Sequence, residues 1–464
     1  MKILFIYTDI NSMNQGARSY SFGISILSAV LKRCGHQTSL YYMYNKYNIK
    51  PFLKKVSDFK PDVLALTSDS TQYVYVKRII ERVKDYKIFT VLGGVHASLY
   101  PHCLMEIEGL DAVCRGEGEF ALLDLVESFK NNKNIFNIKS LNIKESDGTI
   151  RENSTRPLIS DLDSLPFGDR NIFNYQKVID SEFGRASFIL SRGCPYNCTF
   201  CASPAMGKLQ EGKFVRFMSV ERAIAELEWL KRKYLIKTLM FTDDVFTLDK
   251  EYIFKFCERY RDKIAIPYEV NARVECAELG LFKALKESGC FKVHMGIESG
   301  DEKFRSEVLN RHMSNEQIVG AFAMAKKAGL LTKSYNMVGF PFETKELHNS
   351  TIDLNCRIMP DGNMCTIFQP YPGTKLFEVC QDQKFIDKEV FNKELPSRRD
   401  TLLRMPGFPR EQIIRCHKRF SFEVYKKYSL RRAFFYRLYY LDCAEFLLRI
   451  LNPLKGFLRK IAMR

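Results

Sequence analysis

The stretch Cys194-Pro-Tyr-Asn-Cys198-Thr-Phe-Cys201 places three cysteines on one short segment, at spacings of four and then three residues. Before it, residues 186–191 predict a short buried strand, which Gly193 and Pro195 break into a loop. Three thiolates on one tight loop can hold three corners of an iron–sulfur cluster and leave one iron open to another ligand. A structural zinc site and a disulfide remain alternatives, although the zinc site lacks a nearby fourth Cys or His and the disulfide leaves one cysteine over.

The composition of the whole chain bears on its number of domains, the state of its cysteines and its location. The chain has 464 residues, a net charge of +17 and 14 scattered cysteines, so we expect two or three domains and no disulfide framework. The N-terminal run Met1–Asp9 has no cleavage-like site and predicts a first strand rather than a signal peptide. No apolar run approaches the roughly 18–20 residues of a membrane span. The expected location is therefore a reducing cytoplasm, where free thiols persist.

Upstream of the loop, residues 1–135 alternate between strands and helices. Helical periodicity covers Phe22–Cys34 and Val74–Asp85. The predicted strands are 2–7, 38–42, 61–68, 88–92 and 111–114. This alternation predicts an α/β domain with a Rossmann-like, doubly wound parallel sheet. Ligands of such sheets bind at the carboxyl ends of the strands, where this chain has several glycines that let a large flat ligand approach the backbone.

Downstream, the chain divides into three further segments. Residues 136–180 predict a linker that contains a hairpin turn at 145–149. Residues 181–385 alternate again, with strands expected at 186–191, 237–242, 268–271, 292–297, 333–338 and 365–368. Six such units predict a partial (β/α)6 barrel of the TIM type, with its chemistry at the carboxyl ends of the strands. Residues 386–464 predict a mainly helical C-terminal region.

The three-cysteine spacing, with the aromatic Phe200 before the last cysteine, resembles the radical S-adenosylmethionine (SAM) enzymes. The resemblance implies a [4Fe-4S] cluster on Cys194, Cys198 and Cys201, whose open iron binds SAM and cleaves it to a 5′-deoxyadenosyl radical. Segments at four later strand ends also resemble one subgroup of the family, in order and spacing. They imply SAM contacts at Asp243, Glu298, Ser299, Val338 and Gly339, with Arg273 and Arg311 as candidates for the SAM carboxylate. No residue is assigned a catalytic role.

The N-terminal region resembles the cobalamin-binding domain of that subgroup, through the segments that begin at Gly93-Gly94 and at Arg115-Gly116. The cobalamin contacts that this resemblance implies are Thr67, Ser68, Gly93, Gly94, His96, Gly116, Glu117 and Gly118. The chain lacks the Asp-x-His-x-x-Gly motif, whose histidine binds cobalt in many cobalamin proteins. A domain that binds no cofactor therefore remains an alternative, and His96 can equally be a helix-start residue with a local hydrogen bond.

The C-terminal region is basic and aromatic. Residues 410–464 carry 14 Lys or Arg and only 4 Asp or Glu, and aromatic and apolar side chains lie among them. Pro453 separates two expected short helices. Such a segment is typical of a helical cap over the barrel, or of peripheral contact between residues 429–464 and an anionic membrane. Its positive charge would also attract nucleic acid, which we do not favour as a partner.

Together these features predict a cobalamin-dependent radical SAM enzyme. The expected reaction is methylation of an unactivated carbon in a small-molecule, lipid or isoprenoid natural product, with an external one-electron reductant of the flavodoxin or ferredoxin type. The alternatives are a cyclase or rearrangement enzyme of the same architecture, a transfer-RNA methylthiotransferase-like enzyme, and a non-catalytic iron–sulfur redox or scaffold protein. The methylthiotransferase hypothesis lacks a second three-cysteine motif in the N-terminal domain.

Overall fold

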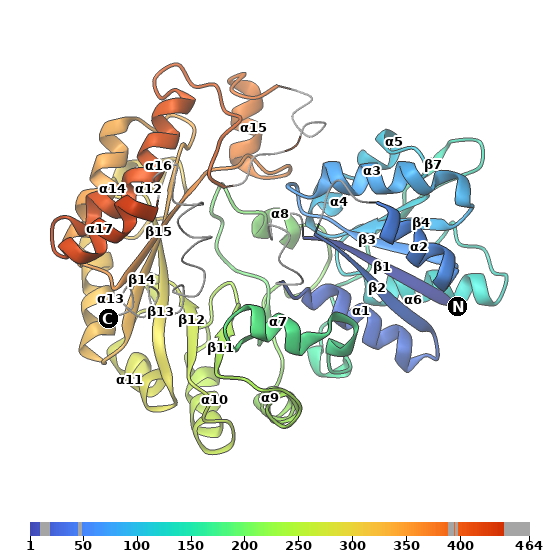
Figure 1. Ribbon diagram of the computed structural model, residues 1–464, viewed down its shortest axis with the longest axis horizontal. Helices are drawn as coiled ribbons and strands as arrows, with labels where there is room; N and C mark the ends of the chain where they lie inside the picture. Colours follow the sequence, from blue (N-terminus) through green and yellow to red (C-terminus); the bar gives the residue numbers. More distant parts are fainter. Residues whose placement is uncertain (10–18, 45–48, 388–393, 395–397, 440–464) are drawn as a thin grey trace.

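The fold rests on two mainly parallel sheets that follow one another along the chain. The computed structural model describes residues 1–9, 19–44, 49–387, 394 and 398–439. The first sheet has the strand order β2-β1-β3-β4-β5-β6-β7, and the second has the order β15-β14-β13-β12-β11-β8. Figure 1 shows the first sheet on the right, the second on the left and helix α8 (Ser203–Gly207) between them. This arrangement confirms the predicted α/β class with a doubly wound sheet followed by a partial barrel.

The first sheet has helices on both faces because its strands bury alternate residues on opposite sides. On β1, Ile3 and Phe5 pack with helices α1 and α6, whereas Leu4 and Ile6 pack with α2 and α3. The five parallel strands are β1 (Lys2–Thr8), β2 (Gln37–Met43), β3 (Val63–Thr67), β4 (Phe89–Gly93) and β5 (Ala112–Cys114). The helices are α1 (Phe22–Arg33), α2 (Lys50–Phe59), α3 (Tyr73–Val83), α4 (Val95–Leu99), α5 (Cys103–Glu106) and α6 (Glu119–Lys130).

An antiparallel hairpin extends this sheet beyond its parallel part. Strand β6 (Leu141–Lys144) pairs with β5, and β7 (Ile150–Arg151) pairs with β6 across the predicted turn. The hairpin lies in the segment predicted as a linker, yet it completes the edge of the first sheet. Helix α7 (Tyr175–Ser181) then leads into the second sheet.

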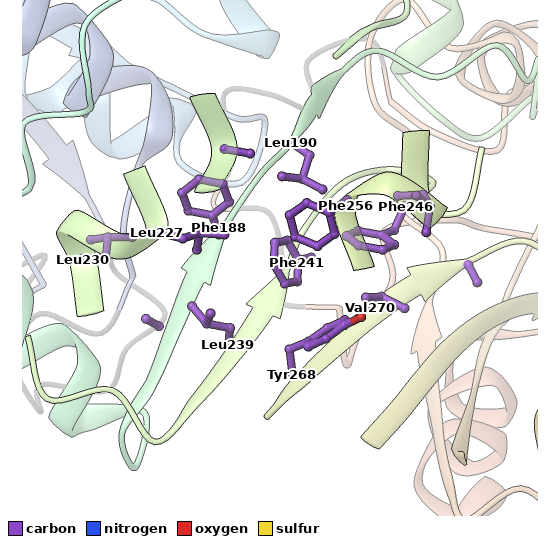
Figure 2. Packing of buried hydrophobic residues seen from close by; sticks show 14 of the residues in the cluster. Phe188, Leu190, Leu227, Leu230, Leu239, Phe241, Phe246, Phe256, Tyr268 and Val270 are labelled. Carbon is purple, nitrogen blue, oxygen red and sulfur yellow. The ribbon is translucent and has the colours of Figure 1, made fainter. Parts of the chain in front are cut away.

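The second sheet contains the six strands that the sequence predicts, all in parallel pairs. They are β8 (Arg185–Phe188), β11 (Thr238–Phe241), β12 (Tyr268–Ala272), β13 (Cys290–Glu298), β14 (Leu331–Val338) and β15 (Gly362–Ile367). Helices α9 (Val220–Lys233), α10 (Lys250–Lys263), α11 (Leu279–Glu287), α12 (Glu302–Glu307), α13 (Asn315–Lys327) and α14 (Lys345–Ile358) connect the strands. Figure 2 shows aromatic side chains of β8, β11 and α10 packed together, including Phe188, Phe241 and Phe256.

The two faces of the second sheet differ in exposure. Along β14, Thr332, Ser334, Asn336 and Val338 are buried, and the residues between them are half-buried. Ser334 bonds Asn355 of α14, so the buried residues point outward to the helices. The alternate residues therefore form the concave face of the partial barrel, which is partly open.

The described part of the C-terminal region covers one edge of the barrel. Helix α15 (Lys375–Asp382) precedes α16 (Arg410–Tyr425) and α17 (Leu430–Tyr439). Helix α16 lies beside α14 and β15 and buries Ile413, Phe420 and Val424 (Figure 1). Residues 440–464, on which much of the tail hypothesis depends, lie outside the described residues. Within the described part of the chain, no helix is both long and apolar enough to cross a membrane.

Candidate active site

The three-cysteine loop begins directly after β9 (Ser191–Arg192). This strand pairs antiparallel with β10 (Arg216–Phe217), which follows the loop in the chain. A backbone hydrogen bond from Cys201 to Cys198 closes the loop into a turn, and the Ser203 amide donates to Cys201 Sγ at 3.4 Å. All three cysteines are free thiols. The sequence prediction that these residues share one loop is therefore confirmed.

The chemistry around the thiols fits an iron–sulfur cluster. Burial raises the pKa of Cys194 to about 11, and a metal that binds this thiol displaces its proton. Arg273 Nη1 and Arg311 Nη1 donate to Cys198 Sγ at 3.4 and 3.7 Å, which suits a sulfur that carries negative charge. Among the described residues, no three His, Cys, Asp or Glu side chains converge on a single metal ion. A cluster does not require such convergence, because each thiolate binds a different iron.

Asp243, a predicted SAM contact, lies beneath this loop rather than facing it. Its carboxylate accepts hydrogen bonds from the amides of Leu190 and Ser191 and from the Ser191 hydroxyl. Burial raises the pKa of Asp243 to about 6, although these hydrogen bonds oppose the shift. The neighbouring Asp244 accepts from Ser203 Oγ at 3.1 Å and lies close enough to Cys194 and Cys201 to raise their pKa. Asp244 is thus the carboxylate nearer the thiols.

Two arginines and Glu298 lie together above the concave face. Arg311 Nη2 donates to the Gly296 carbonyl at 2.6 Å, and Arg273 stacks on the Tyr196 ring at 3.6 Å. Glu298 adopts a left-handed backbone conformation with φ of 67°. Burial raises the pKa of the Glu298 carboxyl, while Arg311 and Arg273 oppose the rise. The structure thus brings Arg273, Arg311 and Glu298 together beside Cys198, in agreement with a shared site for SAM.

The remaining predicted SAM contacts lie at the ends of β13 and β14. The Ser299 hydroxyl is buried and has no hydrogen-bond partner among the described residues, so it is available to a ligand. Val338 is buried, and the Gly339 amide donates to Glu343 Oε2 at 2.5 Å. Sequence reasoning missed Glu343, which accepts hydrogen bonds from the backbone amides of Gly339 and Phe340. Burial raises the pKa of Glu343 to about 8.

A cavity of about 370 Å³ opens between the two sheets. Its walls include the predicted cobalamin contacts Thr67, Gly93, Gly94, Gly116, Glu117 and Gly118, together with Ser191 and Arg192 from the start of the cysteine loop. Apolar side chains of the first sheet and of helices α1 and α6 line much of the rest, including Phe5, Ile24 and Leu122. A mainly apolar cavity at the carboxyl ends of a parallel sheet fits part of a large flat cofactor.

Two predicted cobalamin contacts do not line this cavity. His96 is buried, with its Nδ1 3.0 Å from Ser70 Oγ and its ring against Tyr73. Burial lowers the pKa of His96 to about 3, so its imidazole is neutral. Ser68 is buried, and its carbonyl accepts from the His96 amide. Both residues therefore belong to the turn around Gly94. His96 lies at the start of α4, but its ring bonds Ser70, 26 residues away, rather than a local partner.

Glu117 lines the cavity but is held by arginines of the barrel. Its carboxylate accepts from Arg192 at 2.7 Å and from Arg216 at 2.9 and 3.0 Å, while Arg192 also bonds Glu119 at 2.6 Å. The Glu117 amide donates to Gln210. This interdomain network joins the glycine-rich end of β5 to the residue that precedes the cysteine loop. Sequence reasoning missed the arginines and Gln210, because no local motif marks a partner so distant along the chain.

Replacement of Glu117 by glutamine should lower the free energy of unfolding by about 3 kcal/mol, because it leaves the buried Arg216 guanidinium without a carboxylate partner, whereas Arg192 keeps its other carboxylate partner. The arginines hold the pKa of Glu117 below its usual value. Its contribution is therefore present above the unfolded pKa and is lost as the pH falls through the folded pKa. Denaturant unfolding at several pH values measures both effects. The control Asp58→Asn breaks an exposed pair with Lys54 and should change stability by less than about 0.5 kcal/mol.

Comparisons with known proteins agree with this geometry. The Radical SAM superfamily matches residues 188–354, and the B12 binding domain matches residues 14–126. An uncharacterized methyltransferase of Pyrococcus horikoshii is 30% identical over 422 residues, which cover 89% of this chain and 90% of that protein. The chain belongs to the cobalamin-binding radical SAM enzymes. Its cofactors are accordingly a [4Fe-4S] cluster, SAM and cobalamin, which excludes the zinc and disulfide interpretations of the three-cysteine loop.

Other members of this enzyme family show how far the similarity extends. The radical SAM methyltransferase TsrM from Kitasatospora setae, solved with cobalamin and a [4Fe-4S] cluster, has a TM-score of 0.67 over 83% of this chain and 78% of its own. At 16% identity, that likeness concerns the fold. An anaerobic magnesium-protoporphyrin IX monomethyl ester cyclase of Rubrivivax gelatinosus is 24% identical, over 99% of this chain and 84% of that protein. The family thus includes both methyltransferases and cyclases.

Proposed function

We propose that this radical SAM enzyme transfers a methyl group to a carbon atom of an apolar small molecule. The observation that carries the proposal is the shared cavity, where Gly93 and Gly94 of the first sheet face Ser191 and Arg192 at the base of the cysteine loop. When bound, SAM and the cluster supply an organic radical, and cobalamin supplies a transferable methyl group. The uncharacterized methyltransferase from Pyrococcus horikoshii supports methyl transfer over cyclisation by its name alone, and it is more similar to this chain than the cyclase is.

Within this proposal, the chain's own residues position the cofactors and exclude water. Cys194, Cys198 and Cys201 ligate the cluster, and Arg273 and Arg311 compensate negative charge at Cys198. Proposed SAM contacts are Glu298, Ser299, Val338 and Gly339, whereas Asp243 fixes the loop that holds the cluster. Thr67 and the glycines at 93, 94, 116 and 118 form the proposed cobalamin edge. The proposed reaction also requires an external one-electron reductant of the flavodoxin or ferredoxin type, which reduces the cluster.

Three methionines on the concave face support an apolar substrate. Met240 and Met337 are half-buried there, and Met364 is 39% exposed. Flexible, polarizable thioether side chains form an adaptable apolar surface. A lipid, an isoprenoid or an aromatic natural product would suit such a wall.

Isotope labelling tests the reaction type directly. Cells that produce the protein with cobalamin, fed methionine with a deuterated methyl group, should accumulate a metabolite in which one labelled methyl replaces hydrogen. The same metabolite should be absent from cells that produce Cys201→Ala. Mass spectrometry of organic extracts provides the measurement. A product that depends on Cys201 but carries no label would contradict methyl transfer and favour a cyclase or rearrangement enzyme.

We further propose that α17 contacts anionic membranes, where an apolar substrate dissolves. Leu430, Phe434 and Leu438 recur every four residues and are 77%, 64% and 42% exposed. Arg431 and Arg437 lie on the same helix, and basic residues near a charged surface contribute about 1 kcal/mol each. The apolar stripe and this charge together are typical of an interfacial helix.

Vesicle cosedimentation tests this contact. Full-length protein should partition onto vesicles that contain phosphatidylserine, and partitioning should fall at 1 M salt, where the Debye length is about 3 Å. A chain that ends at Tyr428 should stay in the supernatant, and Phe434→Asp should bind more weakly than wild type. Equal partitioning of the folded truncation would refute the membrane role and leave a helical cap. Preference for structured RNA over vesicles would instead favour nucleic acid.

A further inference from the structure

A chain of three polar side chains, none of them assigned a role above, crosses the concave face of the barrel. Glu269 on β12 lies 2.9 Å from His294 Nε2 on β13, through its Oε2 atom. His294 Nδ1 lies 2.6 Å from the Tyr335 hydroxyl on β14. Three neighbouring strands thus each supply one member of a continuous hydrogen-bonded relay. We refer to Glu269, His294 and Tyr335 as the relay.

The proton positions in the relay follow from the charge of Glu269. Arg185 Nη1 donates to Glu269 Oε1 at 2.9 Å, and Lys292 Nζ lies 3.6 Å from Oε2. His294 and these cations lower the pKa of Glu269 to about 2, against the effect of burial, so its carboxylate can only accept hydrogen bonds. His294 Nε2 therefore carries a proton and donates a hydrogen bond to Glu269. The unprotonated Nδ1 accepts a hydrogen bond from the Tyr335 hydroxyl.

The open end of the relay is the phenolic oxygen of Tyr335. Tyr335 is half-buried on the concave face and pairs in register with Gly296 and with Met364. The Glu298 carboxylate lies over Gly296, beside Arg311, and its charge adds to the effect of burial in raising the pKa of Tyr335. The described residues provide no second hydrogen bond to this oxygen, so its lone pairs remain free. Glu298, a proposed SAM contact, follows Gly296 after a register shift between β13 and β14, so one end of the relay adjoins the proposed SAM site.

Charge compensation alone does not account for this arrangement. Arg185 and Lys292 already neutralise Glu269, and an apolar residue at position 294 would leave both of those contacts in place. His294 instead extends the hydrogen bonding from the buried carboxylate to a half-exposed hydroxyl. We propose that Tyr335, with its proton held by His294 and Glu269, is the contact that accepts a proton or hydrogen bond from a hydroxyl or N–H group of the substrate. The proposal rests on the proposed function, because it assumes that the substrate occupies the concave face.

The proton balance of this contact is simple. When the substrate gives up its proton, a bond forms between that proton and the Tyr335 oxygen. The original Tyr335 proton passes to His294 Nδ1, and the imidazolium that results is paired with the Glu269 carboxylate. No electron is transferred, and the reverse movement returns the proton. The substrate class is therefore an apolar molecule with one hydrogen-bond donor, its apolar body against Met337 and Met364.

A pair of probes that differ in one donor tests this site. The probes are 4-tert-butylcyclohexanol and 4-tert-butylcyclohexanone, because the ketone has a similar shape but cannot donate. Binding to the reconstituted holoenzyme is followed by NMR of ¹³C-methyl methionine, with Met337 and Met364 as reporters and the exposed Met105 as a distant reference. The alcohol should bind about fivefold more tightly than the ketone, which is the range of one net hydrogen bond.

Two variants make the outcome specific to the relay. Tyr335→Phe should abolish the preference for the alcohol. His294→Phe should free the Tyr335 hydroxyl to donate, so that the ketone binds at least as tightly as the alcohol. Tyr86→Phe, an exposed tyrosine outside the barrel, should keep the wild-type preference. Iron content and thermal unfolding confirm that each variant is folded.

Three results would overturn the proposal: equal affinities in the wild type, an unchanged preference in Tyr335→Phe, or no shift at Met337 and Met364 up to the solubility of both probes. The wild-type comparison decides the matter even where a variant does not fold. No methyl transfer is measured, so failure here leaves the labelling experiment unaffected. Conversely, an unlabelled product would contradict the methyltransferase without removing a donor preference at Tyr335.

Discussion

Replacement of Cys198 by alanine should abolish both cluster assembly and SAM cleavage. Cys198 is buried, and its sulfur is the acceptor for Arg273 and Arg311. Without that sulfur, two thiolates remain, which seldom retain a [4Fe-4S] cluster. The two guanidinium groups would also lose the negative charge that they face. Iron analysis after anaerobic reconstitution, and 5′-deoxyadenosine formation after reduction, measure the two losses.

Cys34 supplies the matched control for this experiment. It is an exposed free cysteine directly after α1 and away from the loop, so Cys34→Ala removes one thiol without touching the proposed ligands. We expect that variant to bind about four irons per cluster, like the wild type. Full cleavage activity in Cys198→Ala would refute the ligand assignment. Equal loss in both variants would point to general damage from handling or folding rather than to the loop.

Replacement of Gly94 by alanine should weaken corrinoid binding at least tenfold. Gly94 has a φ of +93°, and an added Cβ would lie 2.7 Å from the Ser68 carbonyl and the Thr67 hydroxyl. Backbone at such a distance has to move, and the end of β3 would be displaced into the cavity. A displacement that costs binding about 1.4 kcal/mol weakens affinity tenfold. Equilibrium dialysis of the folded protein against hydroxocobalamin measures the change.

Gly148 separates crowding from backbone strain in this comparison. It has a similar φ of +87° in the turn between β6 and β7, but an added Cβ would meet no atom within 4 Å. Gly148→Ala should therefore carry the left-handed strain, about 1–2 kcal/mol, and leave corrinoid affinity unchanged. Unchanged affinity in Gly94→Ala would contradict the proposed cobalamin edge, and so would equal weakening in both variants.

The strands were predictable because each is a compact apolar run bounded by turn residues. All five parallel strands of the first sheet and all six of the barrel lie within a few residues of their predicted positions. Helix α2 was not predicted, since Pro51 lies in its first turn and its N-cap residue, Ile49, offers no side-chain cap. Proline is tolerated there because the first turn of a helix leaves its N–H groups unpaired.

The site was predictable only where a residue's role depends on its neighbours in sequence. The cysteine spacing specifies the loop by itself. By contrast, Asp243 and Asp244 are adjacent carboxylates, and only the fold determines which one turns inward to Ser191. Glu117 lies beside two glycines, yet its partners Arg192 and Arg216 are 75 and 99 residues away. Long-range pairs of this kind leave no local pattern, and the relay on the concave face was missed for the same reason.

The alternation of residues along the barrel strands also bears on how the family diversifies. On β14, the even-numbered residues from Thr332 to Val338 are buried on the outer face, and the odd-numbered residues face inward. Substitutions at the inward positions should therefore change the free energy of unfolding little, whereas substitutions at the outer positions should destabilise the fold. Gene duplicates could acquire new substrates by such changes while the cofactor loops, held by separate residues, remain as inherited.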